Sequence, residues 1–425
     1  MLHQELIKRE SEEKYIRIGM SGAGWMAGGF LAQMKHVPGM KVVVVADRDS
    51  RAACEMCRKQ GLEVAQTDTL SAAEDTVKQG KCVVTTDYSL AARIEQVDLL
   101  TDVTPSPASG AETALAAIEH GKDVVLINIE ADVTVGRVLK KRAREKGVLY
   151  SVSSGDEPGC LMELWDFVRT LGYQPIVIGK GKNNPLRSDS NPETVEESAR
   201  KADKDPYQIA SYVDGTKTMF EMACAANATG CLPMKRGMMG PQADLDSVSR
   251  VFALREDGGI TTAPNSVDFV QGDSMAGGVF VTVRVQDERI RADLEYLKVG
   301  KGLYYTFFRP FHLWFLEAPV SFAKAHLYRQ ETLVPLDASF AEVLTVAKKD
   351  LKEGSVLDDF GGFTFFGMIE KADDARKLGA LPAGLAPGAR LVRSVDRGEV
   401  VTWEDVILDE SLAVVKLRRE QEGQV

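Results

Sequence analysis

Histidine is scarce in this sequence, and long apolar runs are missing from it. The five histidines share no metal-ligand spacing, and His312 lies among aromatic residues, so a histidine-based metal site is not expected. No apolar run reaches about 18 residues, the length of a membrane helix, and residues 1–14 are polar and charged. We therefore expect neither a membrane segment nor a signal peptide, and we predict a soluble cytoplasmic protein.

Cysteine is sparse as well, with six residues in 425. Cys54 and Cys57 form one Cys-x-x-Cys pair inside an expected helix, but no second pair stands at zinc spacing. The other four cysteines lie among apolar or small residues. Buried free thiols are the expected state, and a redox or metal role is the alternative.

The chain has fewer basic than acidic residues. The net charge of −10 argues against an extended nucleic-acid surface, although a local basic pocket could bind a small anion. With 44% hydrophobic and 27% charged residues, the chain has a globular composition, and its length predicts two or three domains. The expected partner is a small anionic molecule rather than nucleic acid or a membrane.

The sequence does contain a strand, a glycine turn, a helix and a second strand over residues 15–47. The turn fits Gly-x-Gly-x-x-Ala: Gly22 permits a tight bend, Gly24 lets a pyrophosphate approach, and Ala27 keeps the helix close to the sheet. Asp47 ends the second strand near the offset of about 20 residues expected for a ribose-binding acid. This pattern predicts a nicotinamide dinucleotide site, with a purely structural turn as the alternative. The predicted contacts here are Gly22, Ala23, Gly24, Trp25, Met26, Asp47 and Arg48.

Apolar strands and helical patterns alternate as far as about Gly181, as in a doubly wound fold. Ligands of such sheets bind beyond the carboxyl ends of the strands. We therefore predict that Thr104, Pro105 and Asn128 contact the cofactor, and that Glu130 and Asp132 line the same crevice and bind substrate. The expected strands cover residues 97–104, 123–128, 148–153 and 175–179, and the expected helices cover residues 108–120 and 135–146.

The chain is predicted to be an α/β protein of three domains. Residues 1–181 form a Rossmann domain with a doubly wound parallel sheet, residues 182–343 an α+β catalytic and oligomerisation domain, and residues 344–425 a small β-rich domain. The last domain contains the same sequence pattern twice, at residues 347–357 and 393–401: a strand, a charged residue, a glycine and a second strand. It resembles the SAF-type β-clip module, and a compact interaction domain without chemistry is the favoured interpretation.

Taken together, the chain resembles the homoserine-dehydrogenase-like oxidoreductases, and among them the 1-deoxy-D-xylulose-5-phosphate reductoisomerase-like proteins and the apionate oxidoisomerases. The resemblance implies an NAD(P)-dependent enzyme with a lean towards NADP. The sequence differs from this family at one important position. In homoserine dehydrogenases the strand before the active site ends in Asn-Lys, whereas in this sequence Asn128 is followed by Ile129. Homoserine dehydrogenase activity itself is therefore not expected. The phrases that carry the resemblance are residues 128–136, 154–159, 181–185, 214–218 and 309–313.

A lysine at the start of an expected helix over residues 216–228 is the first catalytic candidate. Lys217 matches, by the resemblance, the acid/base position of the family. A lysine amine that is desolvated in a closed cleft exchanges protons near neutral pH, as hydride transfer at an alcohol carbon requires. Glu221 lies four residues further along the same face, and a surface ion pair is the alternative. The predicted catalytic residues are Lys217, Asp214, Glu221, Asp156 and Glu157.

Polar residues at other strand ends are candidates for metal and substrate contacts. Asp156 and Glu157 follow an expected strand, and their carboxylates could hold a divalent metal, with turn capping as the alternative. Lys180, Lys182 and Asn183 stand at the predicted domain junction. They suit a substrate carboxylate or phosphate, and a solvated charged loop is the alternative.

These features predict an NAD(P)-dependent oxidoreductase acting on a CH–OH group, with reductoisomerase or oxidoisomerase chemistry on a small branched polyol phosphate or sugar acid. A homoserine-type alcohol dehydrogenase and a non-catalytic dinucleotide-binding sensor or scaffold are the alternatives. The apolar stretch at residues 304–322 would form a large exposed patch unless covered, so we expect a homodimer or higher homo-oligomer. Deletion of the residues after about Thr345 is expected to reduce solubility or activity without removing dinucleotide binding to the first domain.

Overall fold

The computed structural model describes residues 1–423, which divide into two compact units. Unit 1 contains Met1–Asp156, Leu313–Val334 and the described residues from Glu410 onwards. Unit 2 contains Glu157–His312 and Pro335–Asp409. The predicted boundaries at residues 181 and 343 stay a prediction, because compactness alone separates two units rather than three domains.

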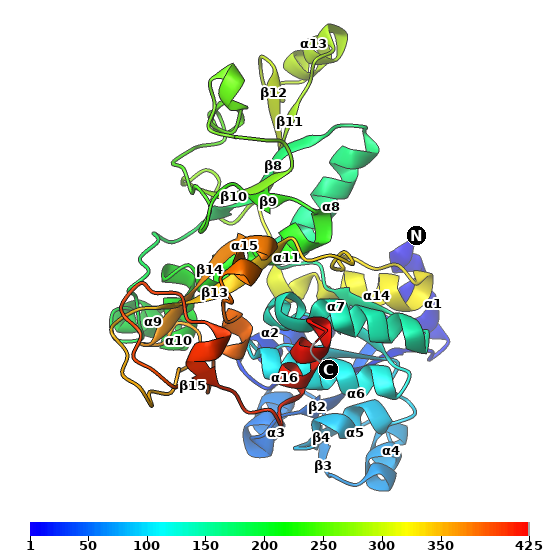
Figure 1. The fold of residues 1–425 in the computed structure, drawn as a ribbon. Helices are drawn as coiled ribbons and strands as arrows, with labels where there is room; N and C mark the ends of the chain where they lie inside the picture. Colours follow the sequence, from blue (N-terminus) through cyan, green and yellow to red (C-terminus); the bar gives the residue numbers. More distant parts are fainter. Residues whose placement is uncertain (424–425) are drawn as a thin grey trace. The chain divides into compact units, whose positions relative to one another are not determined.

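Unit 1 is built on a sheet of seven strands in the order β3-β4-β2-β1-β5-β6-β7. Figure 1 labels β2, β3 and β4 among the helices of this unit. All paired neighbours run parallel. The strand order reverses at β1, and ligands of doubly wound sheets bind at such a point. The predicted Rossmann sheet is thus confirmed. Its strands are β1 (Ile16–Ser21), β2 (Met40–Ala46), β3 (Val64–Gln66), β4 (Cys82–Thr85), β5 (Leu99–Asp102), β6 (Asp123–Leu126) and β7 (Tyr150–Val152).

The helices of unit 1 enclose an apolar core in which Ile16, Ile18 and Met20 of β1 are fully buried. Burial of both faces is usual for a parallel sheet, because helices cover each side. The helices are α1 (Leu2–Ser11), α2 (Trp25–Met34), α3 (Ser50–Lys59), α4 (Leu70–Lys78), α5 (Tyr88–Arg93), α6 (Pro107–Glu119), α7 (Ile129–Lys146), η2 (Trp314–Leu316), α14 (Ala318–Tyr328) and α16 (Ala413–Gln421).

The segment of η2 and α14 belongs to this core. Phe322 is fully buried, with its ring centroid 5.7 Å from that of Phe30 in an edge-to-face arrangement. Phe315 is 7% exposed and packs over Gly29, where a Cβ would lie 2.4 Å from the ring. The second half of the apolar stretch over residues 304–322 is therefore partly covered within unit 1, because these aromatic residues close the core of that unit.

Unit 2 contains a mixed sheet of five strands in the order β12-β11-β8-β10-β9. Its central strand β8 pairs parallel with β10 and antiparallel with β11, and all its residues are buried. The strand predicted at residues 175–179 therefore belongs to this sheet and not to the Rossmann sheet, since a fully buried strand has the same apolar pattern in either. The strands are β8 (Pro175–Lys182), β9 (Leu232–Pro233), β10 (Ser266–Gln271), β11 (Val279–Arg284) and β12 (Tyr304–Arg309).

The helices of unit 2 include a pair, α8 and α11, that pack on each other. The helix predicted over residues 216–228 is confirmed as α11. The helices are α8 (Glu157–Thr170), α9 (Glu196–Ala202), α10 (Pro206–Val213), α11 (Thr216–Thr229), α12 (Val248–Val251), η1 (Arg255–Asp257), α13 (Glu288–Tyr296), α15 (Ala372–Lys377), η3 (Ala383–Leu385) and η4 (Trp403–Asp405).

The C-terminal part of unit 2 is rich in short antiparallel pairs. β13 (Ala341–Ala347) pairs with β14 (Phe365–Lys371), and β15 (Arg390–Leu391) pairs with β16 (Val406–Ile407). The two repeated phrases meet where Leu351 and Val395 exchange backbone hydrogen bonds of 2.8 and 2.9 Å. The small β-rich region is confirmed, whereas its SAF-type assignment stays a resemblance.

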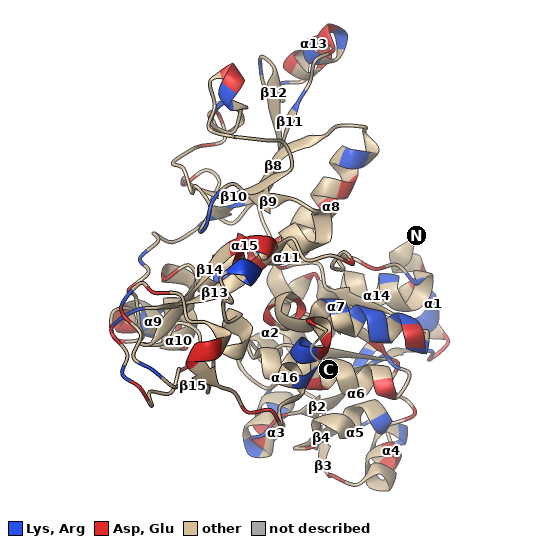
Figure 2. Cartoon of the chain, viewed as in Figure 1, with Lys and Arg blue, Asp and Glu red and all other residues tan. Residues whose placement is uncertain are grey.

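Charged side chains of both signs are interspersed on outer helices such as α1 and α13 (Figure 2). Within residues 1–423, no helix combines the length and apolarity needed to cross a bilayer.

Candidate active site

The glycine turn between β1 and α2 has the shape that a dinucleotide requires. Gly22 has a φ of 103°, and a Cβ there would lie 2.8 Å from Cγ2 of Thr104, so a side chain would be strained. A Cβ on Gly24 would instead meet no atom within 4 Å. The space beside Gly24 is therefore open, as expected where a pyrophosphate approaches the backbone.

Helix α2 begins at Trp25, directly after Gly24. No side chain of the described residues caps its N-terminus, which leaves backbone N–H groups and the positive end of the helix dipole for an anion. Trp25 is 46% exposed and Met26 is half-buried. Ala27 is fully buried, as its predicted role of keeping the helix near the sheet requires.

Asp47 is fixed beside this turn by two backbone hydrogen bonds. Its Oδ2 accepts from the N–H of Ala23 at 2.7 Å, and its Oδ1 accepts from the N–H of Asp49 at 2.8 Å. The carboxylate thus lies at the end of β2, where the acid of a Rossmann fold binds the ribose. Arg48 is exposed.

Asp102, which the sequence analysis missed, organises the neighbouring end of β5. Its buried carboxylate accepts hydrogen bonds from Ser109 Oγ at 2.6 Å, Asn128 Nδ2 at 2.9 Å, and Thr104 N–H and Oγ1 at 2.9 and 2.8 Å. Burial raises the pKa of Asp102 to about 6, against the effect of these donors. The signal for this residue was an acid ending an apolar strand just before Thr104.

Asn128 caps α7, which starts at Ile129 rather than at the predicted residue 135. Its Oδ1 accepts from the N–H of Ala131 at 2.9 Å, and its Nδ2 also donates to the carbonyl of Ser106 at 2.8 Å. The amide is therefore occupied in holding the start of α7. The predicted cofactor contact of Asn128 stays a prediction.

Glu130 and Asp132 lie in the first turn of α7 and are 6% and 3% exposed. Carboxylates are stabilised there by the positive end of the helix dipole. Tyr150 donates its hydroxyl to Oδ1 of Asp132 at 2.9 Å, and a Cβ on Gly136 would lie 2.4 Å from the same oxygen. Asp132 thus has a packing role, and the substrate contacts predicted for both acids stay predictions.

In unit 2, three side chains from three elements form a buried charge cluster. Nζ of Lys180 on β8 donates to the carboxylates of Glu157 on α8 and Glu221 on α11. Burial alone would lower the pKa of Lys180, but the two carboxylates outweigh burial and raise the pKa above its ordinary value. Lys180 is therefore a fixed cation, and a substrate anion would compete with two carboxylates for it.

His312 approaches this cluster from the segment after β12. Its Nδ1 lies 2.8 Å from the carbonyl oxygen of Gly277 and carries the proton, because a carbonyl only accepts. Its Nε2 lies 3.6 Å from Oε2 of Glu157, and Asp156 directly precedes Glu157 in the chain. An imidazole nitrogen beside a carboxylate is a partial metal-ligand set, so these residues are the candidates to hold a divalent ion.

Lys182 lies two residues after Lys180 on β8, so both side chains point to the same face of the strand. Its Nζ donates to the carbonyl of Tyr212 at 2.6 Å. Burial, followed by repulsion from Lys180, lowers the pKa of Lys182 to about 8. A cavity of about 510 Å³ opens beside it, and Asn183 and Asn184 contribute to the polar wall.

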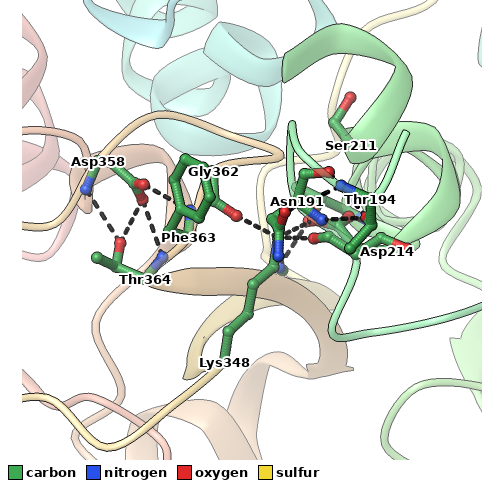
Figure 3. A network of polar contacts seen from close by, with 12 residues as sticks. Asn191, Thr194, Ser211, Asp214, Lys348, Asp358, Gly362, Phe363 and Thr364 are labelled. Atoms are coloured by element: carbon green, nitrogen blue, oxygen red, sulfur yellow. Dashed lines mark hydrogen bonds and ion pairs between the residues drawn. The ribbon is translucent and has the colours of Figure 1, made fainter. Parts of the chain in front are cut away.

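Asp214 lies in a network of polar contacts that includes Lys348 (Figure 3). Its Oδ1 accepts from the N–H of Thr216 at 2.8 Å, and its Oδ2 lies 2.8 Å from Nζ of Lys348. Burial raises the pKa of Asp214, although Lys348 opposes this effect. The carboxylate therefore anchors the C-terminal part of unit 2 to the start of α11, and its predicted catalytic role stays a prediction.

Lys217 is half-buried in the first turn of α11. Glu221, its neighbour one helical turn later, directs its carboxylate to Lys180. The acid/base role predicted for Lys217 is untested by this geometry.

Two consecutive regions of the chain match known families. Residues 16–154 match the Gfo/Idh/MocA model, described as the oxidoreductase family with an NAD-binding Rossmann fold, and residues 155–318 match the catalytic domain of oxidoreductase DRL. These matches support an NAD-binding oxidoreductase whose Rossmann region is of the Gfo/Idh/MocA type. The predicted NAD-binding Rossmann fold and the general class of oxidoreductase are thus confirmed, while the site residues and the homoserine-dehydrogenase-like part of the resemblance stay predictions.

Several solved structures are similar to this oxidoreductase at low identity. A probable dehydrogenase from Thermotoga maritima is 13% identical, with a TM-score of 0.42 and coverage of 74% of this chain and 90% of that chain. A putative myo-inositol dehydrogenase from Sinorhizobium meliloti 1021 is 12% identical, with a TM-score of 0.37 and coverage of 74% and 90%. A DOX-P reductoisomerase in complex with magnesium is 15% identical, with a TM-score of 0.35 and coverage of 49% and 56%. No curated protein matches the sequence of the chain.

All six cysteines of the oxidoreductase are buried, and none forms a disulfide within the described residues, as predicted. Cys54 and Cys57 belong to the core of unit 1, together with Cys82 of β4. Their packing in the core supports the structural interpretation of the Cys-x-x-Cys pair.

Proposed function

We propose that this oxidoreductase transfers a hydride between a nicotinamide dinucleotide and a CH–OH carbon of a small hydroxylated anion. The observation that carries the proposal is the open space at Gly24, at the uncapped start of α2, with Asp47 fixed beside it. A bound dinucleotide supplies the hydride acceptor or donor. The residues of the chain hold the phosphates at α2 and exchange the hydroxyl proton.

The polar cavity of unit 2 supports a hydroxylated substrate. An amine and several amides surround a space of about 510 Å³; they belong to Lys182, Asn183, Asn184 and Gln242. Amides and ammonium groups recognise hydroxyl, carboxylate and phosphate oxygens. A branched polyol phosphate or a sugar acid would pair more of these groups than a homoserine-type alcohol, which favours the first substrate class.

Dinucleotide titration of Gly24→Val tests the proposed site. The new side chain would meet no protein atom at its Cβ, so the fold should persist while the pyrophosphate is excluded. We expect NADH and NADPH fluorescence titrations to show binding to the wild type only. Gly28→Ala is the matched control, because its Cβ would make an ordinary 3.8 Å contact with Met56. Equal affinity of wild type and Gly24→Val would overturn the proposal.

The choice between NAD and NADP depends on two adjacent residues. The fixed carboxylate of Asp47 would accept hydrogen bonds from a ribose 2′-OH and repel a 2′-phosphate, whereas the exposed Arg48 could neutralise that phosphate. The lean towards NADP is retained as a proposal. A more than tenfold preference for NADH, lost in Asp47→Ser, would show that the carboxylate decides.

A lysine of unit 2 is proposed to exchange the proton. Lys217 is the candidate that the sequence supplies, and the structure adds Lys182. Binding of a dinucleotide without turnover of any alcohol or carbonyl compound would instead favour the sensor or scaffold alternative.

Reductoisomerase or oxidoisomerase activity is a second candidate, favoured by the approach of His312 Nε2 to Glu157. A divalent ion there would polarise a carbonyl oxygen during rearrangement of the carbon skeleton. Activity should then fall with EDTA, recover with Mn²⁺ or Mg²⁺, and show weaker metal affinity in His312→Ala. Turnover indifferent to EDTA would contradict the metal requirement.

We also propose a homo-oligomer, most simply a two-fold dimer. Tyr296 and Leu297 in unit 2 are 85% and 67% exposed and offer apolar surface for a contact. Light scattering that gives the mass of a monomer across the micromolar range would contradict the dimer.

A further inference from the structure

Strand β8 brings two lysines to one face but gives them different surroundings. Lys180 is enclosed by the carboxylates of Glu157 and Glu221. None of the ion pairs described within residues 1–423 includes Lys182, whose Nζ donates to the carbonyl of Tyr212 at 2.6 Å. One lysine is thus a neutralised structural cation, and the other is a buried amine at the edge of a cavity.

Charged groups from several elements act on Lys182. Burial disfavours its ammonium form, and the Lys180 cation on the same strand does so as well. Glu221 of α11, Asp214 after α10 and Glu157 of α8 act in the opposite direction, but they are already paired with Lys180 or Lys348. A desolvated lysine next to a second cation is the arrangement that makes an amine reactive near neutral pH.

The wall of the cavity beside Lys182 indicates which molecule fits. Asn184, Gln242 and Gln271 offer amides, Ser247 a hydroxyl, and Asp244 a carboxylate, within a volume of about 510 Å³. Such groups pair with hydroxyls, and an apolar or poorly hydroxylated ligand would leave them desolvated without partners.

We infer that Lys182, and not Lys217, is the catalytic residue that exchanges the hydroxyl proton of a polyhydroxylated carboxylate or polyol bound in this cavity, with Lys180 as its positioning cation. This inference rests on the proposed oxidoreductase function. In oxidation, the O–H bond breaks and its proton passes to the neutral Nζ of Lys182. A bound oxidised nicotinamide would accept the carbon-bound hydrogen with its electron pair as the C=O bond forms, and reduction would reverse each transfer.

Trace acetylation at different pH values, read peptide by peptide by mass spectrometry, tests the amine without requiring turnover. We expect half-maximal reactivity of Lys182 near pH 8, well below the ordinary lysine pKa of 10.5, with the exposed Lys301 as an internal reference peptide. If Lys182 titrates like Lys301, the inference is overturned whatever the activity of the enzyme.

Ligand protection tests the cavity. D-gluconate at tens of millimolar should slow acetylation of Lys182 and leave Lys301 unaffected, because its hydroxyls pair with the amides of the wall. Adipate, which has carboxylates but no hydroxyls, is the control and should protect little. Absent protection, or equal protection by adipate, would overturn the assignment of a polyhydroxylated ligand.

Measurements of turnover then show whether Lys182 or Lys217 exchanges the proton. On an alcohol that reduces NAD⁺ or NADP⁺, Lys182→Met and Lys182→Arg should each lower kcat by about 10²–10⁴ without changing dinucleotide affinity. Arginine retains the positive charge but cannot lose a proton, so activity of Lys182→Arg would overturn the role. A normal kcat in Lys182→Met together with a lowered kcat in Lys217→Met would also overturn the role of Lys182. That result would leave the proposed oxidoreductase function intact. Failure of that function is recognised separately, by absent dinucleotide binding.

Discussion

Nζ of Lys348 lies 2.8 Å from Oδ2 of Asp214, and the two side chains are 3% and 0% exposed. The ammonium also donates to the carbonyls of Ser190 and Gly362 (Figure 3). Gly367 adds a backbone N–H to Oγ1 of Thr216 at 2.9 Å. The C-terminal part of unit 2 is thereby fastened to the turn that starts α11.

Lys348→Met should therefore destabilise the protein by about 3–5 kcal/mol, because it leaves a buried carboxylate without its cation. Chemical denaturation measures the free energy of unfolding. Lys349→Met is the matched control, since Lys349 is exposed and should change stability by less than about 0.5 kcal/mol. Lys348→Met combined with Asp214→Asn removes both charges and should cost less than Lys348→Met alone. Similar stabilities of wild type and Lys348→Met would refute the anchoring role.

The glycine turn could be predicted from the sequence, whereas the charge cluster of unit 2 could not. Gly22 and Gly24 lie two residues apart, and Asp47 follows at a known offset, so local spacing contains the signal. Lys180 and Glu221 are 41 residues apart on a strand and a helix, and no periodicity connects them. Only the packing of α8 and α11 on one another and on the sheet brings these charges together.

Errors in the predicted fold have the same origin. The buried strand at residues 175–182 has no feature that selects one sheet over the other, and pairing with β10 and β11 decides its place. The start of α7 was missed because Asn128 was interpreted as a strand end, although its cap hydrogen bond to Ala131 begins a helix.

Asp102→Asn should alter both stability and cofactor binding. Burial raises the pKa of Asp102 in the folded state to about 6, above its ordinary value of 3.8. Its contribution to stability is therefore complete below about pH 4 and is lost as pH rises through about 6. The stability of the wild type relative to Asp102→Asn should fall by about 3 kcal/mol between pH 4 and pH 7.

The same variant replaces one carboxylate oxygen that accepts hydrogen bonds near Thr104 and Asn128 by an amide donor. Its dinucleotide affinity should therefore fall about tenfold at pH 7, equivalent to about 1.4 kcal/mol. Denaturation at several pH values and NADH titration measure the two effects. A stability difference that stays constant with pH would show that the carboxylate titrates normally.

Lys182→Met should stabilise the folded protein near neutral pH. The pKa of Lys182 is depressed in the folded state, so its favourable contribution exists above its ordinary pKa of 10.5 and is lost as pH falls to about 8. A pKa shift of this size destabilises the folded wild type by about 3 kcal/mol at neutral pH. The variant also loses the hydrogen bond to Tyr212, which stabilises the wild type by about 1 kcal/mol. We expect a gain of about 2 kcal/mol at pH 7 that shrinks as the pH rises from about 8 to about 10.5. A destabilised variant at pH 7 would contradict this account.

The end of the chain is expected to matter for the Rossmann unit. Helix α16 packs on α6 and α7, with Val414 and Leu417 buried. Arg418 donates to the carbonyl of Thr134 at 3.0 Å, and the side chain of Gln421 accepts from the N–H of Val138 at 3.1 Å. These contacts hold the helix whose first turn lies at the carboxyl end of β6.

Truncation near Thr345 should therefore weaken dinucleotide binding, an effect that the sequence did not predict, because it removes α16 from unit 1. Leu417→Ala isolates the effect and should lower the free energy of unfolding by about 2–5 kcal/mol, as for other buried leucines. Lys416→Ala, at the exposed neighbouring position, is the control and should change it by less than about 0.5 kcal/mol. Thermal unfolding and NADH titration measure both variants. Wild-type stability and affinity in Leu417→Ala and in the truncated chain would show that α16 is dispensable for the Rossmann unit.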